Sequence, residues 1–306
     1  MILRLIARVS VVIGMLCIVL MALALSARGW MPSRTLAVES NRTGQWDIFL
    51  YDLHSRRLVN LTADNPYDDR SAAWSSDGHY LAFQSLSEEN QSAEIFILDV
   101  FGGERRQLTR TDSNSSDPAW SPDGSQIAFV LGYGLIHVID LDGTHGYEVA
   151  RGFNPEWSPD STNLLYASFR GNYEQGIYIV NVDGGDARPV FALGILDLAY
   201  WSPSWSADNR YVAFVSESEG NPEIYRVDVA CVLDLDACDR RPLRLTTNPR
   251  RDISPSWSPD SREIAFACET PDGSAICLMD ADGNASRRVL VPTIGEHYFA
   301  PAWRPS

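Results

Sequence analysis

Tryptophan recurs along this chain at intervals of 37 to 52 residues, each time at the start of a variant of the phrase Trp-Ser-Pro-Asp-Gly. The six positions are Trp74, Trp120, Trp157, Trp205, Trp257 and Trp303. Short apolar, strand-like runs follow the first five phrases. About four short strands in a repeat of roughly 45 residues is typical of one β-propeller blade. The sequence therefore predicts an all-β, six-bladed β-propeller over residues 34–306.

The repeated phrase suits a tight turn, because proline presets φ and Asp and Gly tolerate the conformations that follow. We expect the recurrent aspartates to cap their own turns rather than bind a metal ion. They are Asp77, Asp123, Asp160, Asp208 and Asp260. Each tryptophan has a large apolar surface, which we expect to fill the gap between neighbouring blades. Glu156 stands before Trp157 where the other repeats have Ala or Ser, which fits either a functional carboxylate or a local repacking.

The two ends of the repeat region complement each other. Residues 302–306 read as the first strand of a blade, and residues 36–38, 46–52 and 57–62 read as its second, third and fourth strands. We expect these segments to form a composite sixth blade, which closes the ring and leaves no open sheet edge.

An apolar segment precedes the propeller. Residues 9–27 carry no charge and are flanked by arginines. This length can span a bilayer and exceeds the ~7–15 residues of a signal-peptide core, although small residues near Ala24 would also allow cleavage. We expect residues 1–8 in the cytoplasm, residues 9–27 as a transmembrane anchor or signal segment, and residues 28–33 as a linker. The propeller would then lie on the periplasmic or extracellular side, or be secreted after cleavage.

Four of the five cysteines form two close pairs. Cys268 and Cys277 flank an Asp-Gly turn signal, and a two-residue turn there would place them directly opposite each other, within disulfide range. Cys231 and Cys238 bracket an insertion, and a bond between them would staple that loop. Two disulfides fit an exported protein, whereas four free thiols would fit a cytosolic one.

Charge and missing motifs exclude several classes of function. The net charge is −15 and the chain contains no lysine; three arginines in the first thirty residues leave −18 on the remainder. Such a chain is no Schiff-base enzyme or Walker-type nucleotide binder, and it is a poor nucleic-acid binder. We find no hydrolase, metalloprotease or dinucleotide-binding motif. The Asp-x-Asp-Gly phrases at Asp140 and Asp280 lack the remaining spacing of an EF-hand. We expect no cofactor and no metal ion.

The repeat also resembles a known family. Residues 117–129 read DPAWSPDGSQIAF, and residues 255–267 nearly repeat this pattern. With the I-Y-x-x-D and R-x-L-T phrases that follow, it is similar to the WD-like repeat of TolB-type propellers over residues 34–306. The resemblance implies the propeller fold and a place among protein partners in the cell envelope. The family's namesake carries an α/β domain before its propeller and works in a periplasmic complex; we expect the propeller alone here.

Propellers usually bind at the mouth of the central channel, where the repeats of this chain diverge most. The segments that enter the first strands predict a partner-binding surface. Its residues are Asp69, Arg70, Asp117, Asn154, Tyr200, Trp201, Asp252, His297 and Tyr298. Exposed aromatics supply much of an interface's anchor energy, so Trp201 and Tyr298 are the expected anchors. In the alternative interpretation, Tyr200, Trp201 and Phe299 plug the shaft between blades.

These observations favour a non-catalytic, monomeric, membrane-tethered propeller that binds a protein or peptide of the cell envelope and no nucleic acid. A sensor propeller for a small ligand or ion is one alternative. A carbohydrate-active hydrolase or lyase is another, with His297 and acidic side chains in the channel, because propeller enzymes assemble sites from several blades.

Overall fold

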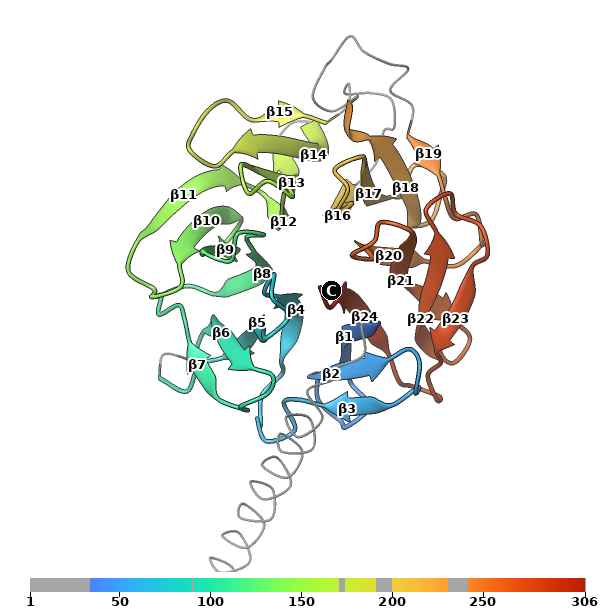
Figure 1. Ribbon diagram of the computed structural model, residues 1–306, viewed down its shortest axis with the longest axis horizontal. Helices are drawn as coiled ribbons and strands as arrows, with labels where there is room; N and C mark the ends of the chain where they lie inside the picture. The colour runs from blue at the N-terminus through green and yellow to red at the C-terminus, as the bar shows by residue number, and fades with distance from the viewer. Residues whose placement is uncertain (1–33, 90, 171–173, 191–199, 231–241, 306) are drawn as a thin grey trace, which may run out of the picture.

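The computed structural model describes residues 34–89, 91–170, 174–190, 200–230 and 242–305. Within these residues, twenty-four strands form six antiparallel sheets of four strands each, arranged in a ring (Figure 1). Each sheet is one blade, so the predicted six-bladed propeller is confirmed. Apolar side chains of the second and third strands are buried on both faces of each sheet, because each blade packs against two neighbours: Leu36 and Val38 face the fifth blade, and Ala37 faces the first.

The strands occupy equivalent places in the six blades. The first, innermost strands are β4 (Arg70–Trp74), β8 (Ser115–Trp120), β12 (Phe153–Trp157), β16 (Tyr200–Trp205), β20 (Asp252–Trp257) and β24 (Tyr298–Trp303). The second strands are β5 (Tyr80–Leu86), β9 (Gln126–Leu131), β13 (Asn163–Arg170), β17 (Tyr211–Ser216), β21 (Glu263–Thr270) and β1 (Thr35–Ser40). The third strands are β6 (Ala93–Asp99), β10 (Leu135–Asp140), β14 (Glu174–Asn181), β18 (Glu223–Asp228), β22 (Gly273–Asp280) and β2 (Asp47–Asp52). The fourth, outermost strands are β7 (Arg105–Gln107), β11 (Gly146–Arg151), β15 (Arg188–Pro189), β19 (Leu243–Arg244), β23 (Arg287–Leu290) and β3 (Leu58–Asn60).

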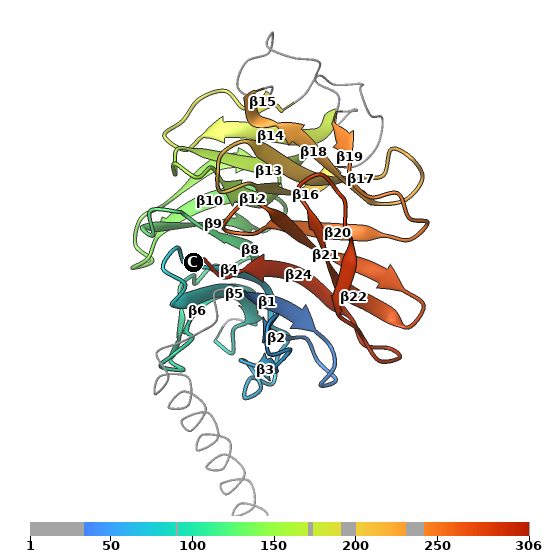
Figure 2. The ribbon, with the colours of Figure 1, turned by 45° about the vertical axis from the view of Figure 1, so that its right-hand side comes forward.

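The sixth blade is composite, as predicted. Its strand order is β24-β1-β2-β3, and Figure 2 shows the red β24 beside the blue β1. Leu36 pairs with Trp303, and the Arg304 amide donates a hydrogen bond to the Thr35 carbonyl at 2.9 Å. The beginning and the end of the described chain therefore close the ring together.

The repeat tryptophans join neighbouring blades, which confirms their predicted role. Each of six apolar clusters combines side chains of two adjacent blades and includes one of these tryptophans. The indole Nε1–H of Trp157 donates to the Ala119 carbonyl of the preceding blade at 3.1 Å. Trp74 makes the equivalent bond to Ala302 at 3.1 Å. Each ring thus contributes apolar contact and, in these cases, a hydrogen bond between blades.

The Ser-Pro-Asp-Gly phrases form the expected turns. The Ser121 hydroxyl donates to Asp123 Oδ1 at 2.6 Å, and Ser158 does the same to Asp160 at 2.6 Å. These bonds hold the pKa values of both carboxyls below their ordinary range. The expectation that these aspartates cap their own turns is confirmed.

Cys268 and Cys277 form a disulfide with their Cα atoms 5.9 Å apart. The bond was predicted correctly, but the predicted register was wrong. Cys268 lies opposite Ala275, so the two cysteines are diagonal rather than directly opposite. Thr270 pairs with Gly273, which places Pro271 at the first central position of the turn, where its fixed φ is favoured. The second predicted pair, Cys231 and Cys238, lies outside the described residues.

The predicted anchor or signal segment, residues 9–27, also lies outside the described residues. Among the residues that the structure does describe, no helix has the length and apolar character needed to cross a bilayer.

Candidate functional site

The first strand of every blade carries a β-bulge at the same place. Pairing with the second strand is interrupted between the fourth and the first residue before the tryptophan. The residue three before each tryptophan has a φ between 43° and 54°, in the left-handed region. These six residues are Ser71, Asp117, Asn154, Ser202, Ser254 and Ala300. Non-glycine residues adopt this conformation at a cost, and all six line the central channel. The bulge therefore turns a ring of small, mostly polar residues toward the axis.

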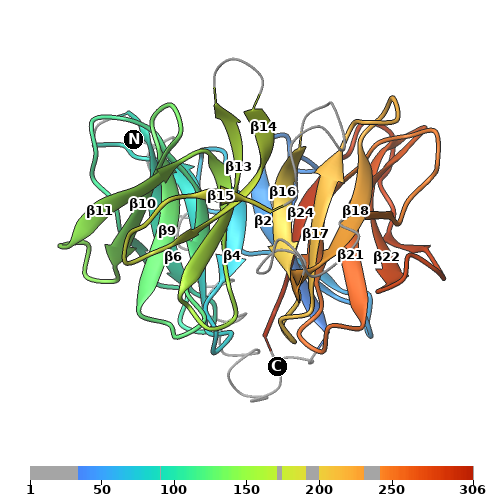
Figure 3. The ribbon, with the colours of Figure 1, turned by 90° about the horizontal axis from the view of Figure 1, so that it is seen from above.

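The channel between the inner strands has a volume of about 980 Å³. We call one end the mouth face; it carries the loops that enter the first strands and those that join second to third strands. His297, Arg251 and Asp272 line the channel at this face. The opposite end, the turn face, carries the Ser-Pro-Asp-Gly turns, and the chain leaves β24 toward it (Figure 3).

Hydrogen bonds run from blade to blade along one wall of the channel. The Ser71 amide donates to Glu39 Oε1 at 3.0 Å, and the Ser71 hydroxyl donates to Asp117 Oδ1 at 3.3 Å. The Asn154 amide favours the charged form of Asp117, and the Trp205 amide favours that of Glu156, so each amide faces a carboxyl of the preceding blade. We call Glu39, Ser71, Asp117, Asn154 and Glu156 the polar arc. It spans the sixth, first, second and third blades, and all its members line the channel.

Burial disfavours the charged forms of the three carboxyls in the polar arc. It raises the pKa of Glu39 to about 7, against the opposing effects of the Ser71 amide and Arg70. It raises the pKa of Glu156 to about 7, against the Trp205 amide. Burial also raises the pKa of Asp117. Burial therefore favours the neutral, protonated forms of all three carboxyls in the polar arc.

An aromatic ladder lies beside the polar arc at the mouth face. We give this name to Trp46, Phe299 and His297, with Arg70 at one end. The Arg70 guanidinium lies 4.2 Å from the Trp46 ring centroid, Trp46 stacks on Phe299 at 5.7 Å, and Phe299 stacks on His297 at 5.8 Å. His297 Nδ1 lies 3.2 Å from the Ser274 hydroxyl. The ladder joins β24, the β1–β2 loop and β4 into one half-buried surface.

Four of the residues predicted at the mouth line the channel. They are Arg70, Asp117, Asn154 and His297. Trp201 is partly buried and packs against the apolar cluster around Trp205. Tyr200 begins β16, but its side chain lies outside what the structure describes.

The other three predicted residues, Asp69, Asp252 and Tyr298, are buried behind the channel wall and are not available to a partner. The prediction was wrong for them because the residue five before the tryptophan points between the strands. Asp69 accepts a hydrogen bond from Asn65 at 2.6 Å, and burial raises its pKa to about 6. Asp252 accepts one from Asn248, and burial raises its pKa to about 7. Only 1% of the Tyr298 surface is exposed.

Sequence reasoning missed Glu39 and Trp46. Glu39 lies in a second strand, opposite Phe299. The second strands of the other blades have neutral residues at this place: Gln84, Val130, Ala167, Val215 and Ala267. An alignment of the second strands would therefore have revealed Glu39. Trp46 lies in a loop that no repeat pattern singles out.

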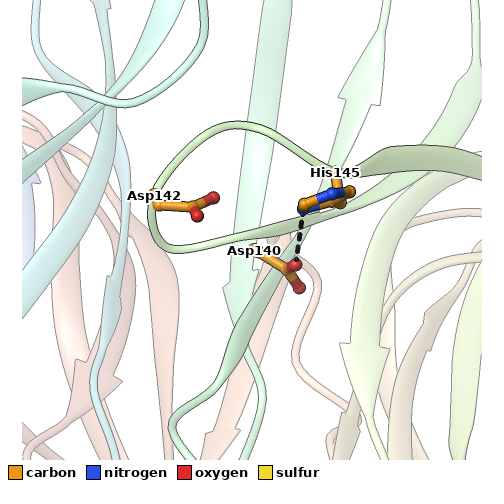
Figure 4. Close-up of side chains that lie close together, drawn as sticks. All are labelled: Asp140, Asp142 and His145. Atoms are coloured by element: carbon orange, nitrogen blue, oxygen red, sulfur yellow. Dashed lines mark ion pairs between the residues drawn. The ribbon is translucent and has the colours of Figure 1, made fainter.

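A separate acidic cluster lies on the turn face, in the β10–β11 turn (Figure 4). Ligand atoms of Asp140, Asp142 and His145 lie within 4.8 Å of one another. Asp140 accepts a hydrogen bond from Gln126 at 3.0 Å, and Asp142 accepts one from the Thr144 amide at 2.9 Å. His145 Nδ1 lies 3.5 Å from Asp140 Oδ2. These contacts shape the turn.

Comparisons with known proteins agree with the fold. The family model described as TolB beta propeller domain matches residues 71–306. A protein TolB homolog of Chlorobium luteolum is 33% identical over 150 residues, which are 47% of this chain and 33% of that protein. The Tol-Pal system protein TolB of Francisella tularensis is 24% identical over 264 residues, 83% of this chain and 58% of that protein. This chain thus spans 33% to 58% of the length of these relatives.

A solved structure shows the same likeness. TolB from Acinetobacter baumannii matches with a TM-score of 0.75 and 19% identity, over 93% of this chain and 70% of that chain. At this identity the likeness concerns the fold.

Proposed function

Since the chain belongs to the TolB β-propeller domain family, we propose that it is a non-catalytic propeller that binds a protein or peptide of the cell envelope at the mouth of its channel. The name of the Francisella relative, a Tol-Pal system protein, supports a partner in the envelope. The observation that carries the proposal is the aromatic ladder beside a channel of about 980 Å³.

The chemistry of the ladder suits a protein partner. Trp, Tyr and Arg dominate the residues on which protein interfaces depend, because they combine a large apolar surface with a polar group. Trp46, Phe299 and Arg70 offer this combination on one half-buried surface. A partner loop that covers the rings would exclude water from them, while its tip enters the channel.

A membrane anchor at residues 9–27 would determine which way the mouth face points relative to the membrane. Thr35 pairs with Asp52 in β2, at the turn face. The chain therefore enters the propeller on the side opposite the mouth. If residues 9–27 anchor the protein in the cytoplasmic membrane, the mouth points away from that membrane, toward partners in the envelope.

Partner capture from the native membrane tests the proposal. We expect Trp46→Ala in the full-length, tagged protein to lower the yield of cross-linked partner at least ~10-fold, because truncation of a central interface aromatic costs ~2 kcal/mol or more. Phe101→Ala is a matched control, because Phe101 is a partly buried aromatic on the turn face. Equal capture by the wild type and a folded Trp46→Ala variant would refute the proposal.

A further inference from the structure

The first strands of the six blades are equivalent, so the residues at each of their positions can be compared across the blades. Immediately before the tryptophan, five blades have Ala or Ser and the third has Glu156. Three residues before the tryptophan, four blades have Ser or Ala, whereas the second has Asp117 and the third has Asn154. The structure of a blade does not require these larger polar side chains. They are nevertheless gathered in neighbouring blades, on one wall of the channel.

The innermost positions of the fourth, fifth and sixth blades are small and neutral: Ser202, Ser254 and Ala300. Arg251, Glu269 and Asp272 of the fifth blade also line the channel, toward the mouth face. At the innermost positions the cavity is therefore asymmetric, with small neutral side chains on one side and the carboxyls of Asp117 and Glu156 on the other.

Of the three carboxyls in the polar arc, Glu39 alone has a cationic partner in the described part of the chain, Arg70 at 4.0 Å. Among the residues that the structure describes, neither Asp117 nor Glu156 forms an ion pair. Arg70, which lines the same wall, lies over Trp46 and has Glu39 at 4.0 Å and Asp68 at 3.4 Å. Buried carboxylates are usually paired with a cation or neutralised. A cation supplied by a ligand would complete this wall.

We propose that the channel receives a basic side chain of the bound partner, an arginine guanidinium or a lysine ammonium, which pairs with Asp117 and Glu156. This inference rests on the proposed function and names the chemistry of the inserted group. The guanidinium presents five N–H donors in a planar fork. Asp117 and Glu156 line the channel from neighbouring first strands, β8 and β12, so an inserted guanidinium has a carboxylate acceptor on each strand. The net charge of −15 also attracts basic segments toward the protein.

Selection from a random nine-residue peptide display library tests this inference. The targets are the full-length wild-type protein, the channel variant Asp117→Asn/Glu156→Gln, and the control variant Asp142→Asn/Glu148→Gln. The control removes the same charge from exposed acids outside the channel. We expect the wild type and the control to enrich Arg and Lys at one peptide position at least threefold over the channel variant.

Two results would overturn the inference. One is an equal enrichment of basic residues by the channel variant and the wild type. The other is an equal loss in the control, which would assign the preference to net charge. A Trp46→Ala target separates this inference from the proposed function. Peptides that depend on Trp46 but carry no basic preference would refute the inference alone, whereas no selected peptide, or peptides indifferent to Trp46, would refute both.

Discussion

Ala37 of β1 lies directly opposite Ala302 of β24, although the two residues come from opposite ends of the described chain. Neither end can form the sixth blade alone, because β24 supplies its first strand and β1, β2 and β3 supply the others. Trp303 adds a hydrogen bond to the Ser256 carbonyl of the fifth blade, at 3.1 Å. The stability of the whole ring is therefore expected to depend on this seam.

Removal of residues 303–306 should destabilise the whole propeller. It deletes a buried tryptophan, and loss of such a side chain costs ~3–5 kcal/mol. Thermal denaturation with a far-UV and a near-UV signal would measure the effect, and both signals should shift together to lower temperature. A truncated protein with the wild-type melting temperature would contradict the claim that the ring is closed by the pairing of β24 with β1.

The Cys268–Cys277 disulfide should be present in the native protein and stabilise the β21–β22 hairpin. Its closed loop is short, so replacement of both cysteines by Ser should cost on the order of 2 kcal/mol. Mass mapping of non-reduced peptides tests the bond, and denaturant unfolding measures its contribution. The same map tests the predicted Cys231–Cys238 bond. Free thiols at 268 and 277 in native material would refute the first pairing.

The fold could be predicted from the sequence where a recurring residue or motif has the same structural role in every blade. The recurrent tryptophans and Ser-Pro-Asp-Gly turns predicted the blades, and the incomplete repeats at both ends predicted the seam. The register of the β21–β22 hairpin was harder to predict. Both Pro271-Asp272 and Asp272-Gly273 can form the two central residues of a turn, and only packing decides between them. The structure selects the first, and the carbonyl of Glu296 approaches Gly273 so closely that a Cβ there would lie 1.9 Å from it.

The candidate site was harder to predict than the fold. Each first strand contains a bulge that changes which side chains face the channel. No sequence pattern predicted this bulge. Asp117 and Asn154 therefore reach the axis, while Asp69 and Asp252 point into the blade. Glu39 and Trp46 come from segments that lie next to the mouth only because the composite blade places them there.

Glu156 should reduce stability at alkaline pH. In the folded protein its pKa is about 7, above its ordinary value of 4.5. Its favourable contribution to the free energy of unfolding is therefore complete below pH 4.5 and is lost as the pH rises through 7. Glu156→Gln should raise the melting temperature at pH 8 by ~2–4 °C and leave it unchanged at pH 4. Asp123→Asn is a control of opposite sign, because the pKa of Asp123 is lowered. If Glu156→Gln raised the melting temperature equally at pH 4 and pH 8, the raised pKa of Glu156 would be contradicted.

Tyr298 should behave as a core residue rather than a binding anchor. Tyr298→Ala should lower the free energy of unfolding by ~3–5 kcal/mol, since it leaves a cavity. Tyr298→Phe removes only the hydroxyl, which accepts a 3.3 Å hydrogen bond from Arg42, and should cost ~1 kcal/mol. Chemical denaturation of both variants tests this order. A stable Tyr298→Ala variant would contradict the burial.

Site-specific photo-cross-linking in living cells tests the central claim most directly. A photoreactive residue at position 46 or 133 would report on the mouth face, since Tyr133 is fully exposed in the β9–β10 hairpin there. The same residue at position 142 would report on the turn face. The account predicts a discrete protein adduct from positions 46 and 133 and none from position 142. Adducts from position 142 alone, or none from either mouth position, would contradict it.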